Sequence, residues 1–579
     1  MKSQSVSIQG LGQNEDFLKK AYRAALIPCI LSILSGCINI IADGIIVGQK
    51  IGANGLTAIN LCIPVYLILC IIGSLFVSGA AISASNEIGK DNFEAAQKYY
   101  GIALGICTVS SLIMAVVGVF LSGVIAKLLC SDPLVLEMVE DYTKITLIGA
   151  LPKIMIYIPF WFLRLDGKNK TITVMMTVMG FGNILLDLLF LFVFDMGVSG
   201  AALASVIATG LACLIGFIWQ HKGDAMFKFR PSSPEKKKMK SIFSAGSPAA
   251  LNNLMQTGRL LTMNLLLMSN GGSEAVAAFS VVNGISAFAE AVTVGVPQAA
   301  TAMLGVYHGE HDNKSVRIMI KQEVINGIIY CLMFGLVIGF GSGVIGILYG
   351  LDFSVKIPMI CLALSLIPAL FTNILSGFYN VSGHSILSNQ IIISRVFLFP
   401  VTAFVIMLSL NGPVWLFLPL GEILTLLIWL YASWKIQKKK GDLSRFLLLD
   451  TRLEKSGNII NFSVKSDNED ICSACEKITD FCSENGMARK QTMSVSLALE
   501  ELMTLITQKN TTQKVNFDIR LFSLQGTIGI RIRYDGRDLN PLAGDRDSQE
   551  YMGIAMIEKL VQEVVYKRVF GLNSMLILI

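Results

Sequence analysis

Residues 24–48 read AALIPCILSILSGCINIIADGIIVG, an apolar stretch with one charged side chain, Asp43. Crossing the hydrocarbon core of a bilayer takes about 20 mainly apolar residues, so this stretch is long enough to span a membrane. The whole chain fits repeated crossings, because 53% of its 579 residues are hydrophobic and only 15% are charged. Soluble domains carry roughly a quarter charged residues. The sequence therefore predicts a polytopic membrane protein.

Comparable apolar stretches recur along the chain in two groups of six, separated by a basic segment at 222–241. The predicted fold is an all-α membrane protein with about twelve transmembrane helices in two six-helix lobes, 15–221 and 242–437. A linker at 438–456 and a small cytoplasmic α/β sandwich domain at 457–579 follow. The spans are expected at 24–48, 57–83, 100–126, 143–163, 171–194, 198–220, 243–268, 274–305, 321–349, 356–380, 388–410 and 413–435.

A weak internal repeat relates the two lobes at an offset of about 220 residues. Glu87-Ile88-Gly89 lines up with Tyr307-His308-Gly309, and a Lys-Asp-Asn or a His-Asp-Asn turn follows. Gly167 and Gly383 occupy matching loops, and 51–58 lines up with 271–278. Two such repeats would enclose a cavity near the bilayer midplane, where transporters of this design bind substrate. Chance similarity is the alternative explanation.

The charges indicate orientation rather than nucleic-acid binding, although the formal net charge is +6. Lys and Arg gather in alternate loops, above all at 222–240 and 438–440. Because such loops stay in the cytoplasm, both termini are expected there, in a cytoplasmic membrane protein. We expect a small-molecule substrate, membrane lipids and a cytoplasmic protein as partners of a monomer.

The cysteines predict neither disulfides nor a metal site. Most of the twelve lie in apolar spans and resemble small apolar side chains. Cys472-x-x-Cys475 lacks the second pair that a four-ligand zinc site needs. We therefore expect no metal and no cofactor.

Two carboxylates inside predicted spans are the strongest functional signal. A charged side chain at the bilayer centre costs roughly 2.5–3.5 kcal/mol on insertion scales, so it normally has a functional partner. Asp43 lies in the first span, and Asn183 and Asp187 share one helix face in the fifth. Oxygen ligands of this kind can share a proton or bind a sodium ion. The structural alternative is a carboxylate that only holds neighbouring helices together.

Other polar or adaptable groups lie inside the second lobe and the fifth span. Gln256 could line a cavity, and the flexible side chains of Met175 and Met179 suit a binding surface, although core packing would explain them too. Arg395 and Glu422 are candidates for a structural ion pair.

Taken together, these residues make the sequence resemble the multidrug and toxic compound extrusion (MATE) family over about 15–437. The motifs that carry the resemblance are Pro28 with Asp43 and Val47-Gly48, Gly89-Lys90-Asp91, Arg164-Leu165-Asp166-Gly167, Asn183-x-x-x-Asp187, 196–205, Pro297, 305–309, and Arg395 with Pro400.

The resemblance implies a two-lobed bundle that exports amphipathic cations in exchange for protons or sodium. It places the coupling site at Asp43, Asn183 and Asp187, with Ser205 where the family often has Thr. Some branches use an acidic residue in the seventh span, where this chain offers Gln256, which favours coupling through the first lobe. Pro28 would act as a hinge in the first span, because proline removes a helix hydrogen bond.

From about residue 457 the pattern is that of a soluble domain. Alternating stretches at 459–465, 515–522 and 527–534 predict strands, 470–485, 489–510 and 552–562 predict helices, and two short strands follow at 564–569 and 574–578. The segment resembles the histidine-kinase-like (GHKL) ATPase fold of anti-sigma factors, through 497–504, Asp535-Gly536, Asn540-Pro541, 553–557, 566–568 and 571–573.

Two departures predict a vestigial nucleotide site in this domain. Leu505 stands where the family has a metal-holding Asn four residues after Glu501, and Tyr534 stands at the adenine-reading Asp, although Asp535 is adjacent. Gly536 and Gly553 complete the vestigial set. We expect a sensor or docking module without ATP turnover.

The leading interpretation is that the protein is a secondary antiporter of a bacterial cell membrane and not an enzyme. A primary pump is disfavoured because the sequence contains no Walker A motif. A flippase for lipid-linked substrates would be expected to line its cavity with Arg or Lys. A membrane sensor acting through its C-terminal domain would bind without transporting. A protein kinase is disfavoured by Leu505.

Overall fold

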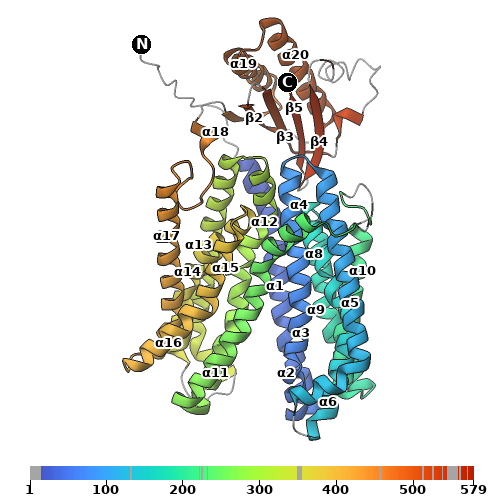
Figure 1. Ribbon diagram of the computed structural model, residues 1–579, viewed down its shortest axis with the longest axis vertical. Coiled ribbons are helices and arrows are strands. Elements are labelled where there is room, and N and C mark those ends of the chain that lie inside the picture. Colours follow the sequence, from blue (N-terminus) through green and yellow to red (C-terminus); the bar gives the residue numbers. More distant parts are fainter. Residues whose placement is uncertain are drawn as a thin grey trace. The chain divides into compact units, whose positions relative to one another are not determined.

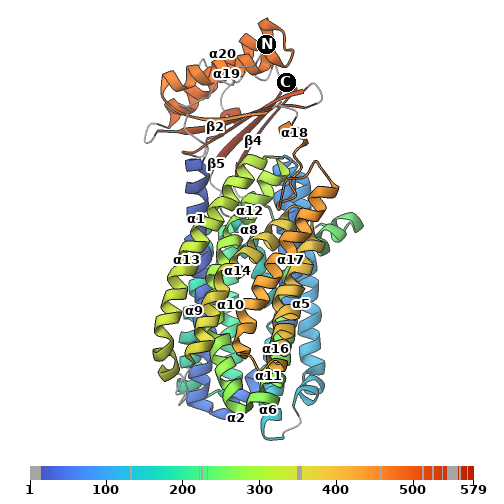
Figure 2. The same ribbon diagram turned by 90° about the vertical axis from the view of Figure 1, so that its left-hand side faces the viewer.

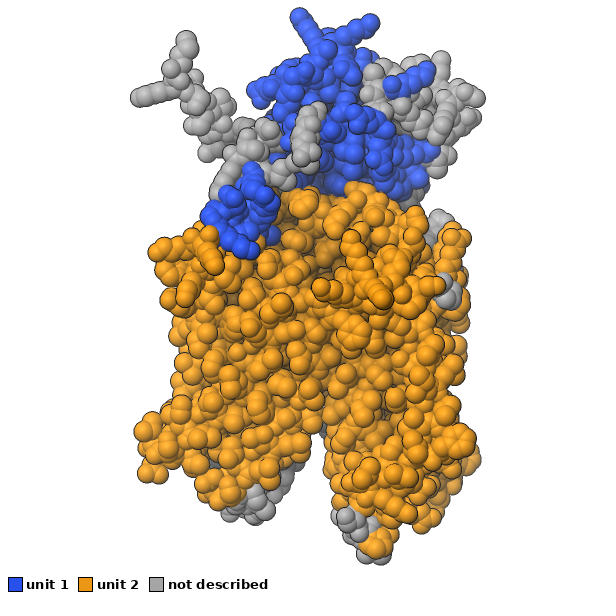
Figure 3. Space-filling model, viewed as in Figure 1, with its two compact units in different colours: residues 1–23, 440–444, 449–579 blue, residues 24–439, 445–448 orange. Residues whose placement is uncertain are grey.

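The computed structural model describes residues 15–579 apart from 131–132, 221, 223–225, 231, 349–354, 456–458, 511–513, 525–526, 538, 544–558, 560–561 and 570–571. The chain divides into two compact units (Figures 1 and 3). The larger one, 24–439 with 445–448, is here called the membrane unit. The smaller one consists of Met1–Arg23, Lys440–Ser444 and Leu449–Ile579.

The first half of the membrane unit is helical throughout, as its apolar stretches predict. Its elements are α1 (Glu15–Ile51), α2 (Ala53–Leu61), α3 (Ile63–Gly73), the π-turn η1 (Ser74–Ser78), α4 (Gly79–Gly89), α5 (Phe93–Leu129), α6 (Pro133–Ile148), α7 (Ala150–Met155), α8 (Tyr157–Leu165), α9 (Asn169–Leu188), the π-turn η2 (Leu189–Val193) and α10 (Gly197–Gln220).

The second half repeats this pattern. Its elements are α11 (Lys236–Thr293), α12 (Gly295–Gly309), α13 (Asn313–Leu348), α14 (Lys356–Val381), α15 (Ser385–Ile393), the π-turn η3 (Ser394–Leu398), α16 (Phe399–Ser409), the 3₁₀ turn η4 (Val414–Leu416) and α17 (Phe417–Lys439). The last part of the predicted basic linker, from Lys236 on, is already helical.

Within the described residues, nine helical segments are long and apolar enough to cross a membrane. A tenth arises if Val135–Ile148 and Ala150–Leu165, which meet at a 58° bend, form one span. This bent pair covers the fourth predicted span. The membrane unit is thus a multi-helix bundle of the predicted class.

The long helix α11 reverses direction. Its 58 residues would extend about 87 Å if straight, against a bilayer core of about 30 Å. Yet the Gln256 side-chain amide nitrogen, Nε2, donates a hydrogen bond to Glu290 Oε1 over 3.1 Å. In a straight helix these two residues would lie about 51 Å apart. The reversal agrees with the two separate spans predicted at 243–268 and 274–305.

Matching turns in the two halves support the internal repeat. After α4, Asp91 adopts φ 61°, and after α12, 220 positions later, His311 adopts φ 54°. The next amide closes each turn over 2.9 Å, from Asn92 N to Glu87 O and from Asp312 N to Tyr307 O. The equivalent turn is therefore 310–312, one residue earlier than the predicted His-Asp-Asn.

A second pair of turns behaves in the same way. Gly167 (φ 71°) and Gly383 (φ 80°) lie in the left-handed region, which glycine adopts without strain. Lys168 N bonds to Leu163 O over 2.9 Å, and His384 N bonds to Tyr379 O over 2.8 Å. The two halves thus share turn geometry at both positions predicted from the sequence.

At the end of the bundle that carries the α4 and α12 turns, the two halves are packed together. A Cβ at Gly89 would lie only 2.2 Å from Val306 O, and one at Gly309 would lie 2.3 Å from Asn86 O. Asn86 also donates to Val381 O over 3.0 Å. The opposite end of the membrane unit divides into two legs (Figure 3), with α2 and α6 in one and α16 in the other (Figure 1).

The C-terminal part of the smaller unit is an antiparallel sheet with two helices on one face (Figure 2). The strand order is β1-β2-β3-β5-β4. The elements are α18 (Arg452–Lys455), β1 (Ile459–Lys465), α19 (Asn468–Glu484), α20 (Arg489–Lys509), β2 (Asn516–Leu524), β3 (Thr527–Tyr534), the 3₁₀ turn η5 (Pro541–Ala543), β4 (Glu563–Val569) and β5 (Leu572–Leu578).

Alternation along the strands explains which side chains of the sheet pack against the two helices. Phe517, Ile519 and Leu521 of β2 are buried in the core that β3, β5 and the two helices share, since successive strand residues point to opposite faces. The predicted helix at 552–562 lies almost wholly outside the described residues.

Candidate functional site

The structure brings together the acidic cluster predicted from the sequence. The Asn183 amide nitrogen on α9 donates to Asp43 Oδ1 on α1 over 2.8 Å, and also to Asp187 Oδ2 one turn along α9. Asn183 is 2% exposed and Asp187 is fully buried. Asp187 Oδ1 is buried without a hydrogen-bond partner, so the cluster keeps an acceptor available for a proton or a small cation.

Ser205 does not join this cluster, because its hydroxyl accepts a hydrogen bond from Lys153 Nζ over 3.0 Å. Lys153 lies on α7, is 8% exposed, and places its ammonium 5.4 Å from the centre of the Tyr66 ring. The sequence interpretation missed Lys153. The rule that identified Asp43 could have found it, since it lies near the middle of the apolar span at 143–163.

A cavity of about 320 Å³ lies within the first half, beside these groups. It contains the Asn183, Lys153 and Ser205 side chains and is lined as well by Ser32, Ile33, Gly36, Tyr66, Leu69, Cys70, Ile156, Tyr157, Phe160, Met176, Met179 and Thr209. Its volume is at the lower end of the range for small-molecule pockets, roughly 300–1,000 Å³.

Two of the residues predicted to line a cavity occupy other environments. Met179 lines the first-half cavity, but Met175 is fully buried against α10, where a Cβ at Gly216 would lie 2.6 Å from its methyl group. Its neighbour Met176 lines the cavity instead. Gln256 lines neither this cavity nor the central one and is hydrogen-bonded to Glu290.

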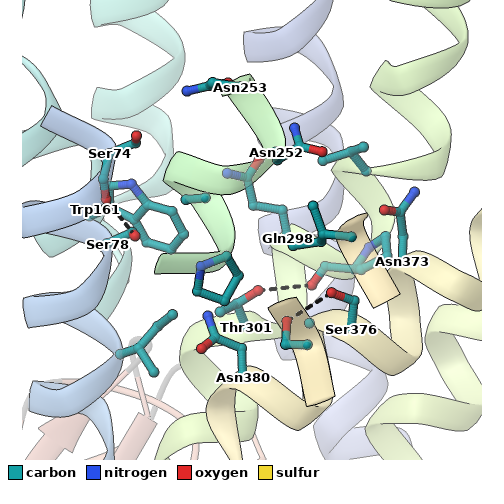
Figure 4. Close-up of a pocket in the computed structure, with 18 of the residues that line it drawn as sticks. Ser74, Ser78, Trp161, Asn252, Asn253, Gln298, Thr301, Asn373, Ser376 and Asn380 are labelled. Atoms are coloured by element: carbon teal, nitrogen blue, oxygen red, sulfur yellow. Dashed lines mark hydrogen bonds between the residues drawn. The ribbon is translucent and has the colours of Figure 1, made fainter. Parts of the chain in front are cut away.

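A second cavity, of about 330 Å³, lies between the two halves (Figure 4). In the close-up, Ser74, Ser78 and Trp161 of the first half face Asn373 and Ser376 of the second. Its lining consists of uncharged amides and hydroxyls with aromatic rings, from Ser74, Ser78, Ile82, Tyr157, Phe160, Trp161, Pro248, Ala249, Asn252, Asn253, Val294, Pro297, Gln298, Thr301, Asn373, Ser376, Gly377, Asn380, Ser388 and Ile392.

The two cavities share a wall. Tyr157 and Phe160 of α8 line both of them, so these two aromatic rings lie between the first-half cavity and the central cavity. Ser74 and Ser78 belong to the π-turn η1, and π-turns inside α-helices are frequent at functional sites. A ligand of amphipathic character would find both ring faces and hydrogen-bonding groups here.

Two charged side chains of the second half, Arg395 and Glu422, are paired. Arg395 Nε donates to both Glu422 oxygens over 2.9 and 3.1 Å, and Arg395 Nη1 donates to Asn373 Oδ1 over 2.5 Å. Thr372 Oγ1 also donates to Glu422, over 3.1 Å. The pair predicted as structural therefore also orients Asn373, a residue of the central cavity.

Glu290 is a second acid that the sequence interpretation missed. It accepts from Gln256 on the opposite arm of the α11 hairpin. The second half thus contains an acidic group next to the seventh predicted span, although that span itself offers only Gln256. The signal was present in the sequence, because Glu290 lies inside the span predicted at 274–305.

Pro28 lies within α1, and its carbonyl accepts a hydrogen bond from Ser32 Oγ over 2.6 Å. Asp43 is 15 residues further along the same helix, so about four helical turns separate them. The hinge role of Pro28 stays a prediction.

In the C-terminal unit, three residues of the predicted vestigial nucleotide site make contacts that stabilise the fold: Leu505, Tyr534 and Asp535. Leu505 of α20 is buried in the core, whereas Glu501 is exposed. The Tyr534 hydroxyl donates to Leu539 O over 2.8 Å, and the Asp535 carboxylate accepts from the Asn516 backbone amide, also over 2.8 Å.

Of the two glycines in that set, Gly536 lies in a tight turn. Gly536 adopts φ 114°, and a Cβ there would lie 2.5 Å from Asn510 Oδ1, so the turn requires glycine. Gly553 lies outside the described residues.

Comparisons with known proteins identify what the membrane unit is similar to. The sequence matches the MatE family over residues 28–193 and 248–411. The multidrug export protein MepA of Staphylococcus aureus (strain MRSA252) is 26% identical over 408 residues, which are 67% of this chain and 87% of the relative. MepA of Staphylococcus haemolyticus (strain JCSC1435) is 25% identical over 375 residues, 63% of this chain and 81% of the relative.

A solved structure has the same fold. The outward-facing conformation of a multidrug resistance MATE family transporter of the MOP superfamily superimposes with a TM-score of 0.67 at 21% identity. The match covers 75% of this chain and 100% of that one.

Proposed function

The chain belongs to the MatE family, and from this membership we propose that it is a secondary active antiporter that exports amphipathic or cationic drugs or metabolites in exchange for H⁺ or Na⁺. The observation that carries the proposal is the buried cluster of Asp43, Asn183 and Asp187 beside a cavity. Its two carboxyl groups compete for one amide, and Asp187 retains an unpaired oxygen.

The cluster suits ion coupling for an electrostatic reason. Two carboxylates in a dry site repel one another, so occupancy by a proton or a cation is favoured. Release of that ion restores the repulsion between the Asp43 carboxylate on α1 and the Asp187 carboxylate on α9, which weakens the contact between these two helices. Each charge that moves across 100 mV supplies roughly 2.3 kcal/mol, which is enough to drive a useful concentration ratio.

The central cavity supports transport of amphipathic molecules. It lies between the two halves, with aromatic rings on one side and neutral amides on the other. The contact near Gly89 and Gly309 closes one end, whereas the opposite end divides into two legs (Figure 3). Opening the first contact and bringing the legs together would expose the cavity to the other side of the membrane.

We further propose that the membrane unit consists of twelve spans in two six-helix lobes. The nine apolar segments, the bent fourth span and the two arms of the α11 hairpin together make this number. Two pairs of matching turns support two equivalent lobes: Asp91 and His311 lie 220 positions apart, and Gly167 and Gly383 lie 216 apart. The basic loops favour a cytoplasmic location for both termini.

For the C-terminal unit we propose a GHKL-like domain that senses or docks a cytoplasmic protein and does not hydrolyse ATP. Leu505 presents a hydrocarbon side chain where a metal-holding Asn is expected, and Asp535 is engaged by Asn516. ATP turnover by a purified 457–579 fragment would overturn this assignment, whereas a folded fragment without turnover supports it.

The transport proposal is tested by ethidium efflux from energised cells that lack other multidrug pumps. Cells expressing the wild type should extrude ethidium, and cells expressing Asp43→Asn at the same level should not. Asp195→Asn is a matched control, because it makes the same chemical change at a carboxylate whose side chain is 78% exposed and which lies outside both cavities. Absence of efflux by well-expressed wild type would count against multidrug export.

A further inference from the structure

The buried lysine of the first-half cavity is not explained by the proposed coupling site. Lys153 lines the cavity and is only 8% exposed. An isolated charge inside a membrane protein is costly, so intramembrane lysines usually pair with another group or mark a substrate pathway.

The contacts of Lys153 leave its charge uncompensated by any direct ion pair. An ammonium has three N–H donors. One bonds to Ser205 Oγ over 3.0 Å, and the Tyr66 ring lies 5.4 Å away. Within the described residues, no carboxylate oxygen comes within 4.0 Å of Nζ. At least one donor therefore remains for a group that enters the cavity.

An acidic group is also near but separated from the lysine. Asp43 and Lys153 are close enough to attract each other, while Asp43 itself is held by Asn183. Asn183 forms the cavity wall on that side. The cavity thus has Lys153 and the amide that holds Asp43 in the same lining, together with the apolar side chains of Met176, Met179 and Phe160.

We propose that Lys153 binds an anionic group of the exported molecule, so that the preferred substrates are zwitterionic amphiphiles that carry a carboxylate as well as a cationic or amine group. The carboxylate accepts from Lys153, the cationic end lies toward Asn183 and Asp43, and the apolar body contacts the methionines and Phe160. This inference rests on the proposed transport function and narrows its substrate class.

The charge arrangement disfavours a purely cationic ligand in this cavity. A monocation placed near Lys153 meets a like charge in a medium of low polarity, where Coulomb repulsion is poorly screened. A carboxylate in the same place forms a charge-assisted hydrogen bond, which is stronger than a neutral one. The direct consequence is that the cavity should bind a ligand with a free carboxylate more tightly than the same ligand with that carboxylate esterified.

A matched pair of dyes tests this consequence. Rhodamine 123 is the methyl ester of rhodamine 110, so the two share the same cationic ring system and differ in the free carboxylate. Their affinities are measured by fluorescence polarisation on the purified full-length protein in lipid nanodiscs. Wild type should bind the acid about tenfold more tightly than the ester, a difference of about 1.4 kcal/mol.

Three variants identify the residue responsible. Lys153→Met keeps the side-chain length and removes the charge, and it should lower the acid-to-ester ratio to about one by weakening acid binding. Lys153→Arg should retain most of the ratio. Lys127→Met removes an exposed lysine of α5 and should leave the ratio unchanged.

The outcomes separate this inference from the transport proposal. An unchanged ratio in Lys153→Met, or a wild type that prefers the ester or binds neither dye, would overturn the inference. Those results would not contradict the transport proposal, because ethidium efflux and its dependence on Asp43 are measured independently. If wild type shows the ratio but cells show no efflux of any dye, Lys153 still binds the carboxylate, whereas the ligand is not an exported molecule and the transport proposal fails.

Discussion

Replacing Gly89 by alanine should open the contact that closes one end of the membrane unit. In the structure, a Cβ at Gly89 lies 2.2 Å from Val306 O and 2.7 Å from the Gly309 Cα, whereas ordinary contacts begin at 3.4 Å. One side must therefore move by roughly 1 Å, and no flexible side chain is available to yield, because both clashing atoms belong to the backbone.

The expected energy follows from measured overpacking. Extra atoms in a tightly packed site cost typically about 1–3 kcal/mol. The cost applies only where the halves touch, so it lowers the ratio of this closed state to the alternative by about 5- to 150-fold. The helix itself tolerates alanine, which has a higher helix propensity than glycine.

The assay is a distance measurement by pulsed electron spin resonance between labels on Lys90→Cys and Lys314→Cys. Both positions are exposed: Lys90 lies in the turn after α4, and Lys314 lies just after the equivalent turn, at the start of α13. The exposed Cys472 is replaced by Ser. Gly89→Ala should shift the distribution to longer distances and slow ethidium efflux.

Gly105→Ala in α5 is the matched control, because a Cβ there meets no atom within 4 Å. It should leave both the distances and the efflux unchanged. A Gly89→Ala variant with the wild-type distance distribution would refute the idea that this glycine contact holds the closed state.

Three further predictions concern stability and thiol reactivity. Arg395→Met leaves Glu422, whose side chain is 12% exposed, without its ion-pair partner. The thermal unfolding temperature of the purified protein should fall, because an unpaired buried charge costs about 3–5 kcal/mol of stability. The double variant Arg395→Met/Glu422→Leu should recover part of this loss. In the C-terminal unit, burial raises the pKa of the Cys475 thiol from 9.0 to about 12. Because the folded state then keeps a proton that the unfolded state releases near pH 9, the stability of this unit should decrease as the pH rises from 9 toward 12. Urea unfolding at pH 8 and pH 10 measures the change. An equal free energy of unfolding at the two pH values would contradict the prediction. At pH 8 the exposed Cys472 should react with maleimide while Cys475 stays unmodified until the protein unfolds.

The acidic cluster could be predicted because two general rules meet there. A carboxylate in an apolar span needs a partner, and residues four apart share a helix face. Both rules apply to Asp43, Asn183 and Asp187 without knowledge of the fold. The first rule applies equally to Lys153 and Glu290, so those residues were recognisable from their spans alone.

The partners of individual side chains could not be predicted. Met175 and Met176 are adjacent in the sequence but point about 100° apart on α9. One packs against Gly216 and the other lines the cavity, and the periodicity of α9 does not reveal which face meets α10. In the same way, the family resemblance places Ser205 with the acidic cluster, whereas its hydroxyl accepts from Lys153. That bond depends on how α7 meets α10, which the sequence does not reveal.

The helix count shows a different limit. Hydropathy separates 243–268 from 274–305, whereas the structure continues helical hydrogen bonding through the reversal and forms one element, α11. The bent fourth span shows the converse, since one apolar stretch divides into α6, α7 and α8. Apolar length thus indicates which stretches are long enough to cross a membrane, but not where a helix begins and ends.

The central claim is that ion movement through the acidic cluster drives export. The most direct measurement uses the purified protein in liposomes with an interior dye for pH or for sodium, and adds a transported substrate without ATP. The account predicts that wild type exchanges substrate for protons or for sodium, and that Asp43→Asn binds substrate but moves no ion. Substrate transport by wild type with no flux of either ion, or equal ion flux in Asp43→Asn, would contradict it.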